Sequence, residues 1–261
     1  MRDFGACGQL WHRDGRQQVL TSSGGTASPS LSRYNGCMAN QAYLDVWCKD
    51  FSEQRMADQL GAFLATVPFS TTRPGFTHLT VRAVDSSETP LLEDDLRPAP
   101  LDANGIIEII GEHVHSDASY EVRSHWDLWE FDAASAKWAN GPEGLEIFCH
   151  GEDYDDAFWR ENGHLQVNLG FEHLFTGHAG LLGIRQVGKA AAESAEEARF
   201  MEAMVWPENL QAYHEKTRHN IRKLLDWVRR IEKAIQVKQV KLWSEGEENF
   251  EARMEEILAV R

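Results

Sequence analysis

The chain has 261 residues, of which 42% are hydrophobic and 10% aromatic, and this composition indicates a globular protein and excludes a disordered one. The formal net charge of -15 argues against a nucleic-acid partner, because phosphate binding needs clustered Lys and Arg. No run approaches the ~20 consecutive apolar residues that cross a bilayer, and the N-terminus lacks the apolar stretch of a signal peptide. We therefore expect a cytoplasmic protein with no membrane partner.

The acidic residues are unevenly distributed along the chain. Residues 85–156 contain 19 Asp and Glu against 3 Lys and Arg, so this stretch carries the whole charge imbalance. An acidic surface favours solubility and attracts cationic partners.

Residues 1–40 are rich in Ser, Gly and other turn formers and show no sustained hydrophobic period. We predict that they form a loosely ordered N-terminal arm.

Five later segments alternate apolar and polar side chains with a period of two, which is typical of strands with one buried face. The segments are 42–49, 76–84, 120–131, 145–150 and 164–175. Helical spacing follows the first segment, and a short apolar run follows the second. The order β-α-β-α-β-β-β predicts an α+β domain over residues 41–188. We expect a two-layer sandwich, with a five-stranded, mostly antiparallel sheet and helices on one face.

Residues 189–261 show the spacing of amphipathic helices, including one long helix that begins at Pro207. We predict an all-helical C-terminal region.

Short motifs predict neither a metal site nor a cofactor. The stretch GIRQVGKA at 183–190 matches a phosphate-binding loop except at Ala190, which lacks the hydroxyl that binds Mg²⁺. The HVH at 113–115 has no further ligand nearby, and the acids of 151–156 lack the spacing of a calcium loop. No CxxC pair occurs among the four cysteines, Cys7, Cys37, Cys48 and Cys149.

The outward face of the predicted sheet carries Trp, Phe, Arg and His instead of the Lys, Glu and Thr of an ordinary solvated face. Trp and Arg are enriched at the centres of interfaces. We therefore predict a binding surface there, although the C-terminal helices could cover it and exposed aromatic residues also stabilise strands. The predicted binding residues are Trp47, His78, Arg82, Arg123, His125, Asp127, Trp129, Phe148, His150, Gln166, Asn168 and Glu172.

These features favour a non-enzymatic module that binds another protein or a second copy of itself. An acidic protein that masks a basic toxin or enzyme would have this character. The alternative is a metal-dependent or acid–base hydrolase, because a His/Asp/Glu group is predicted on the same face. That group is His125, Asp127, His150 and Glu172.

Overall fold

The computed structural model describes residues 40–132, 135, 137–177 and 195–259. The chain divides into two compact units, Met1–Asn35 and Gly36–Arg261, and only the second contains described residues. The predicted N-terminal arm, apart from Asn40, lies outside the described residues, as do the glycine-rich motif at 183–190 and two of the cysteines.

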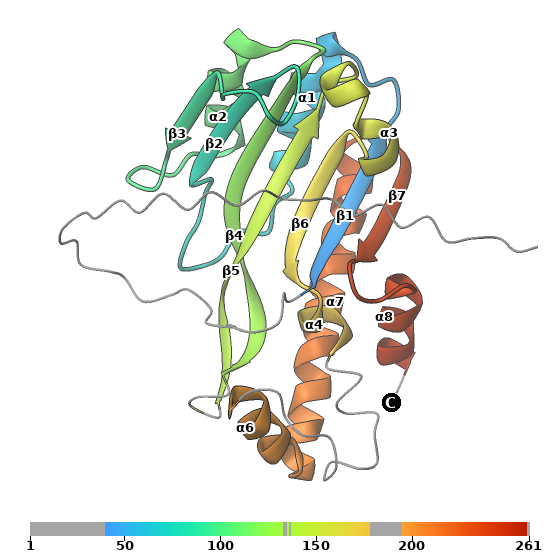
Figure 1. The fold of residues 1–261 in the computed structure, drawn as a ribbon. Helices are drawn as coiled ribbons and strands as arrows, with labels where there is room; N and C mark the ends of the chain where they lie inside the picture. The colour runs from blue at the N-terminus through green and yellow to red at the C-terminus, as the bar shows by residue number, and fades with distance from the viewer. Residues whose placement is uncertain (1–39, 133–134, 136, 178–194, 260–261) are drawn as a thin grey trace, which may run out of the picture. The chain divides into compact units, whose positions relative to one another are not determined.

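A seven-stranded antiparallel sheet forms the centre of this unit (Figure 1). The strands are β1 (Gln41–Cys48), β2 (His78–Ala83), β3 (Leu92–Asp95), β4 (Ala118–Asp132), β5 (Lys137–His150), β6 (Leu165–Phe171) and β7 (Val237–Ser244). Their order in the sheet is β3-β2-β4-β5-β6-β1-β7. The predicted α+β fold with an antiparallel sheet is confirmed, whereas the prediction of five strands is wrong.

Three helices cover one face of the sheet and lie behind it in Figure 1. They are α1 (Glu53–Leu64), α2 (Ala103–Ile110) and α7 (Pro207–Ala234). The other described α-helices are α3 (Trp159–Asn162), α4 (His173–Thr176), α6 (Ala195–Met204) and α8 (Phe250–Ala259). Two short 3-10 turns are η1 (Gly111–His113) and η2 (Tyr154–Asp156). Met56, Ile106 and Trp227 connect α1, α2 and α7 to the core. No helix in the described ranges is long and apolar enough to cross a membrane.

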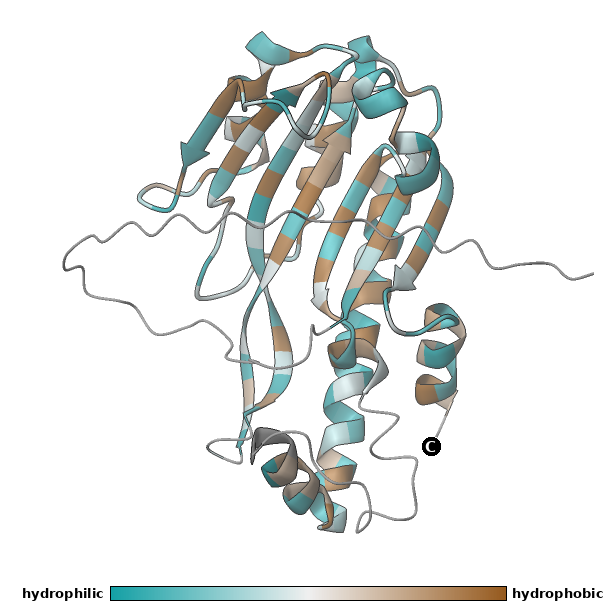
Figure 2. Cartoon of the chain, viewed as in Figure 1, coloured by the Kyte–Doolittle hydropathy of each residue, from teal (hydrophilic) through white to brown (hydrophobic). Residues whose placement is uncertain are grey.

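The buried face of the sheet follows the predicted alternation, which Figure 2 shows as changes of hydropathy along each strand. One row of side chains illustrates it, because strand register places them side by side across β2, β4, β5, β6 and β1. The row is Leu79, Val122, Ile147, Val167 and Leu44, each 0% exposed. Hydrophobic burial of this kind stabilises by about 25 cal/mol per Å² of apolar surface, so it fixes the register of the strands.

The two strands that the sequence did not predict are the edges of the sheet. β3 has only four residues, LEDD, which is too short to show a period. β7 has the sequence VKQVKLWS, and Leu242 is its one buried side chain. Lysines on an edge strand discourage pairing with other chains, but they also obscure the hydrophobic alternation. The predicted all-helical C-terminal region is therefore wrong, since β7 separates α7 from α8.

β4 and β5 are longer than their neighbours and continue beyond the sheet as a two-stranded ribbon (Figure 1). A second, smaller hydrophobic cluster joins this ribbon to α6 and α7. It contains Phe131, Phe200, Met204 and Tyr213.

Candidate functional site

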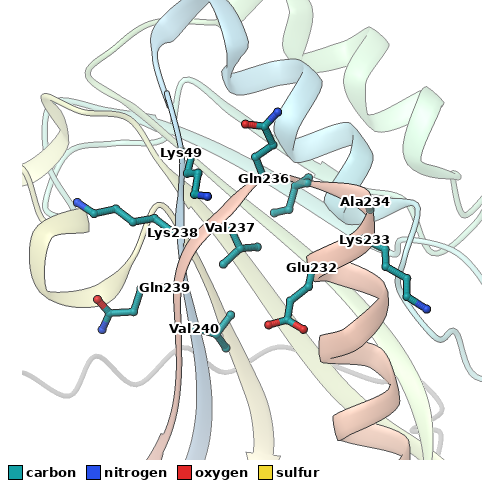
Figure 3. Close-up of a pocket in the computed structure, with 10 residues that line it drawn as sticks. Lys49, Glu232, Lys233, Ala234, Gln236, Val237, Lys238, Gln239 and Val240 are labelled. Carbon is teal, nitrogen blue, oxygen red and sulfur yellow. The ribbon is translucent and has the colours of Figure 1, made fainter.

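An open pocket of about 530 Å³ lies where α7 ends and β7 begins (Figure 3). Lys49, Lys233 and Lys238 contribute flexible side chains to it, together with Glu232. Its lining contains no aromatic ring and no buried polar side chain that lacks a partner. The sheet itself carries the more distinctive group of side chains.

The side chains opposite the core form a second face, here called the polar face, in three rows across β2, β4, β5 and β6. The rows are Arg82–Ser119–His150, Thr80–Glu121–Phe148–Gln166 and His78–Arg123–Glu146–Asn168. Seven of the predicted binding residues lie in these rows, because period-two alternation and correct register place them on one side.

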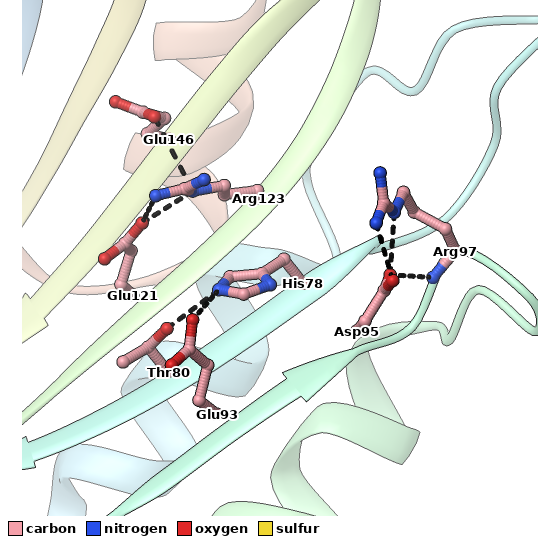
Figure 4. Close-up of polar contacts among 8 residues, drawn as sticks. All are labelled: His78, Thr80, Glu93, Asp95, Arg97, Glu121, Arg123 and Glu146. Carbon is pink, nitrogen blue, oxygen red and sulfur yellow. Dashed lines mark hydrogen bonds and ion pairs between the residues drawn. The ribbon is translucent and has the colours of Figure 1, made fainter. Parts of the chain in front are cut away.

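Several charges of the polar face are already paired with one another (Figure 4). Arg123 Nε donates a hydrogen bond to Glu121 Oε1 at 2.6 Å and lies 3.6 Å from Glu146 Oε1. His78 Nε2 lies 2.9 Å from Thr80 Oγ1. Arg123 is thus held between two carboxylates of the same face.

Two predicted binding residues on the ribbon are covered by the chain itself. Asp127 Oδ2 accepts hydrogen bonds from the Thr71 backbone N–H at 2.9 Å and the Thr71 hydroxyl at 2.8 Å. The Lys216 ammonium of α7 lies 3.2 Å from the centre of the Trp129 ring. The expected open surface therefore does not extend to this end of β4, because α7 and the loop before β2 pack there.

Three further predicted binding residues lie away from the open part of the polar face. His125 Nε2 lies 3.4 Å from Arg73 Nη1, and burial, followed by the charge of Arg73, lowers the pKa of His125. Trp47 is only 9% exposed. Glu172 follows the end of β6, where its Oε2 accepts a hydrogen bond from the Gly246 N–H at 3.0 Å.

The four residues of the hydrolase alternative are not brought together. His150 pairs with Ser119 at one end of the β4–β5 ladder, whereas His125 pairs with Gly144, ~20 Å further along at ~3.3 Å per residue. Within the described part of the chain, no three His, Cys, Asp or Glu residues are placed to hold a metal ion. The proposed shared site of the alternative is therefore wrong.

A cavity of about 260 Å³ lies at the end of the polar face where β5 ends. Four predicted binding residues, Arg82, Phe148, His150 and Gln166, line it. The loop 151–158 supplies a wall with Tyr154, Asp155 and Phe158. The cavity has room for one side chain or a fragment-sized molecule, since pockets for drug-sized ligands usually measure about 300–1,000 Å³.

Four of the side chains that line the cavity are aromatic rings. The Phe148 and His150 rings are nearly parallel, with centroids 6.0 Å apart, and Tyr154 lies parallel to His150 at 5.6 Å. Phe158 meets His150 edge to face at 4.9 Å. Phe148 and His150 share one side of β5 because they are two residues apart, and the loop brings the other two rings over them.

His150 is the central polar group of the cavity and is 5% exposed. Its Nδ1 forms a 3.0 Å hydrogen bond with the Ser119 hydroxyl, while its Nε2 is buried with no hydrogen-bond partner among the described residues. Burial, followed by the nearby His164, lowers the pKa of His150 to about 4. The imidazole is therefore uncharged at neutral pH.

The Ser119–His150 pair lacks, among the described residues, the third group that orients a catalytic base. A catalytic histidine normally has a pKa near the operating pH and a carboxylate or amide on its second nitrogen. His150 has a low pKa, and none of the described side chains bonds its Nε2. The pair is better suited to holding the imidazole in one orientation.

The backbone around the cavity is strained. Asp155, Asp156 and Ala157 have φ of 47°, 54° and 65°, and Val84 has φ of 72°. The Asp155 N–H donates to the Val84 carbonyl at 2.8 Å, so the two strained segments hold each other. Positive φ is unfavourable for Val in particular, and such strain is concentrated at binding sites in proteins.

Exposed apolar side chains surround the same end of the sheet. Phe158 is 37% exposed, Val84 56% and Leu91 60%. Leu91 lies beside β2, because its N–H donates to the Val81 carbonyl at 2.8 Å. We call Val84, Leu91 and Phe158 the apolar rim. Apolar side chains that gather next to a pocket are typical of interaction sites.

Acidic side chains lie next to the apolar rim. Burial, followed by the charge of Asp155, raises the pKa of Tyr154, and Asp85 acts in the same direction. Arg82 acts in the opposite direction, but its Nη1 already donates to the Glu88 carbonyl at 3.0 Å. The surroundings therefore favour a positively charged ligand.

The sequence did not indicate Ser119, Tyr154 or Phe158. The acids of 151–156 are typical of a solvated turn, yet Tyr154 is only 4% exposed. One feature of the sequence could have indicated Tyr154 and Phe158, namely that they are two aromatic residues in an otherwise acidic loop.

Comparisons with protein-family models, with curated proteins and with solved structures found no match to this chain.

Proposed function

We propose that the chain is a non-enzymatic binding protein that docks a basic partner protein at the cavity end of its polar face. The observation that carries this proposal is the coincidence of an aromatic cavity, an apolar rim and an acidic border. Interfaces gain most of their affinity from a few buried anchors that are surrounded by polar residues.

Electrostatics support a basic partner in preference to a second copy of the same acidic chain. Like charges across an interface weaken binding, whereas complementary potentials accelerate association. We place this function in the cytoplasm, because Cys48 and Cys149 are buried free thiols and reduced cysteines are usual there.

The test is affinity capture from cell extract with the intact protein and two matched double variants. Leu91→Ser with Phe158→Ser removes two residues of the apolar rim. Val205→Ser with Trp206→Ser removes two side chains that are 62% and 60% exposed, on the connection between α6 and α7. Each captured protein is then purified and titrated by calorimetry at low and high salt.

We expect a basic partner that binds the wild type and the Val205/Trp206 variant equally and binds the rim variant at least tenfold more weakly. Added salt should weaken the complex, because it screens the carboxylates beside the cavity, Asp85 and Asp155. Equal capture by all three proteins would show that the cavity end is not the docking surface.

A further inference from the structure

Building on the proposed function, we infer that the cavity holds the guanidinium group of one arginine side chain from the basic partner. The cavity volume of about 260 Å³ suits a single side chain. The rings of Phe148 and Tyr154 are both nearly parallel to the His150 ring, and Phe158 meets that ring edge to face.

A planar cation fits such an enclosure. Guanidinium groups stack on aromatic faces and are less strongly hydrated than ammonium groups, so they enter aromatic sites more readily. A lysine would bring a compact, strongly hydrated charge that cannot stack.

The charges that line the cavity favour a cation over a neutral group. Glu121 and Asp155 contribute carboxylates, and Arg82 is the single cationic side chain of the lining. The Arg82 guanidinium is held by the Glu88 carbonyl, and Glu121 is shared with Arg123. Asp155 is therefore the carboxylate best placed to receive an incoming charge.

His150 adds a polar atom without adding charge. Its Nε2 is the one buried polar side-chain atom of the described lining that lacks a hydrogen-bond partner. An N–H of the guanidinium would supply that partner, which a purely apolar side chain cannot do.

The test uses nuclear magnetic resonance of the full-length protein with single amino-acid probes. N-acetyl-arginine methylamide is compared with the citrulline analogue, which has the same shape and no charge, and with the norleucine analogue. We expect a dissociation constant on the order of millimolar for arginine, with shifts at Phe148 and Tyr154. The citrulline analogue should bind at least tenfold more weakly.

Two variants of the strained loop provide a matched pair. Asp155→Asn removes the carboxylate that lines the cavity, and Asp156→Asn removes the neighbouring one that does not. Both residues have positive φ, which Asn tolerates as well as Asp, so both variants keep the loop. Arginine binding should weaken at least threefold in the first variant and less than 1.5-fold in the second.

Equal binding of arginine and citrulline, or stronger binding of norleucine, would overturn the guanidinium assignment. If the Leu91→Ser/Phe158→Ser variant still fails to capture the partner in that case, the proposed docking function stands. The partner side chain in the cavity would then be apolar. Conversely, arginine binding at the cavity without any rim-dependent partner would retain the guanidinium site and overturn the docking function.

Discussion

Asn220→Ala is expected to destabilise the fold by about 2–5 kcal/mol, because three backbone groups lose their partners. Asn220 lies on α7 and is 1% exposed. Its Oδ1 accepts the Trp129 N–H at 2.9 Å, and its Nδ2 donates to the carbonyls of Trp129 at 2.9 Å and Leu174 at 3.0 Å. One side chain thus joins α7 to the edge of β4 at Trp129 and to α4.

The effect is measured as a change in the free energy of unfolding in urea. Asn209→Ala is the matched control, because Asn209 lies on the same helix and its Nδ2 makes one hydrogen bond, to the Ala203 carbonyl at 2.9 Å. That variant should lose about 1 kcal/mol or less. Similar losses for the two variants would show that the contact between α7 and the ribbon is held by packing alone.

The Asn220 contact also shows why the sequence could not reveal how α7 sits on the sheet. An isolated Asn in a helical pattern carries no information about its partners. The length of the ribbon was equally hidden, since β5 contains the turn-like residues ANGPEG at 139–144. Trp129 and Asp127 therefore looked like open surface, although neighbouring elements cover them.

The inward residues of the five predicted strands were read correctly, because burial of one face imposes a period that is local in sequence. The same reasoning placed Arg82, Phe148, His150 and Gln166 on one side. The cavity itself depends on how the loop 151–158 folds back over the sheet. That fold is set by tertiary contacts such as the one between Asp155 and Val84, which no periodic pattern encodes.

Asp45→Asn is expected to stabilise the protein at pH 7 by about 3 kcal/mol, at ~1.4 kcal/mol for each pKa unit. Asp45 is 1% exposed, and burial raises its pKa from 3.8 to about 6. Its Oδ1 accepts a hydrogen bond from Gln166 Nε2 at 3.0 Å, and its Oδ2 accepts one from Trp243 Nε1 at 2.6 Å. An Asn can keep both contacts if the Gln166 amide turns over.

The pH dependence of this gain follows from the direction of the shift. Because the pKa of Asp45 is higher in the folded state, the folded protein binds more protons between pH 3.8 and about 6. The contribution of Asp45 to stability is present below pH 3.8 and is lost as the pH rises through 6. The advantage of Asp45→Asn should therefore vanish near pH 4, where the wild-type side chain is protonated.

Two histidines act in the opposite direction over nearly the same range. His164 accepts the Cys48 N–H at its Nδ1, at 3.0 Å, and stacks between Phe51 and Trp159. Burial is the main cause that lowers the pKa of both His164 and His150 from 6.5 to about 4. Their contribution is present above pH 6.5 and is lost as the pH falls through 4.

In the wild type the gain from protonating Asp45 offsets part of the loss from protonating these histidines. Asp45→Asn removes that compensation, so its stability should fall more steeply than that of the wild type between pH 6.5 and 4. Urea unfolding at both pH values measures the two slopes. Asp50→Asn is the control, because Asp50 is exposed after β1 and its replacement should change stability by less than about 0.5 kcal/mol.

A loss of stability in Asp45→Asn at pH 7 would mean that the hydrogen bonds from Trp243 and Gln166 outweigh the cost of burying the carboxylate. The expected gain would instead identify a buried charge that the protein retains at the expense of stability. Gln166 also lines the cavity, so the Asp45 carboxylate fixes the orientation of an amide in the candidate site. Destabilising groups are commonly kept where function requires a fixed geometry, so a gain in stability of Asp45→Asn would support the proposed binding site.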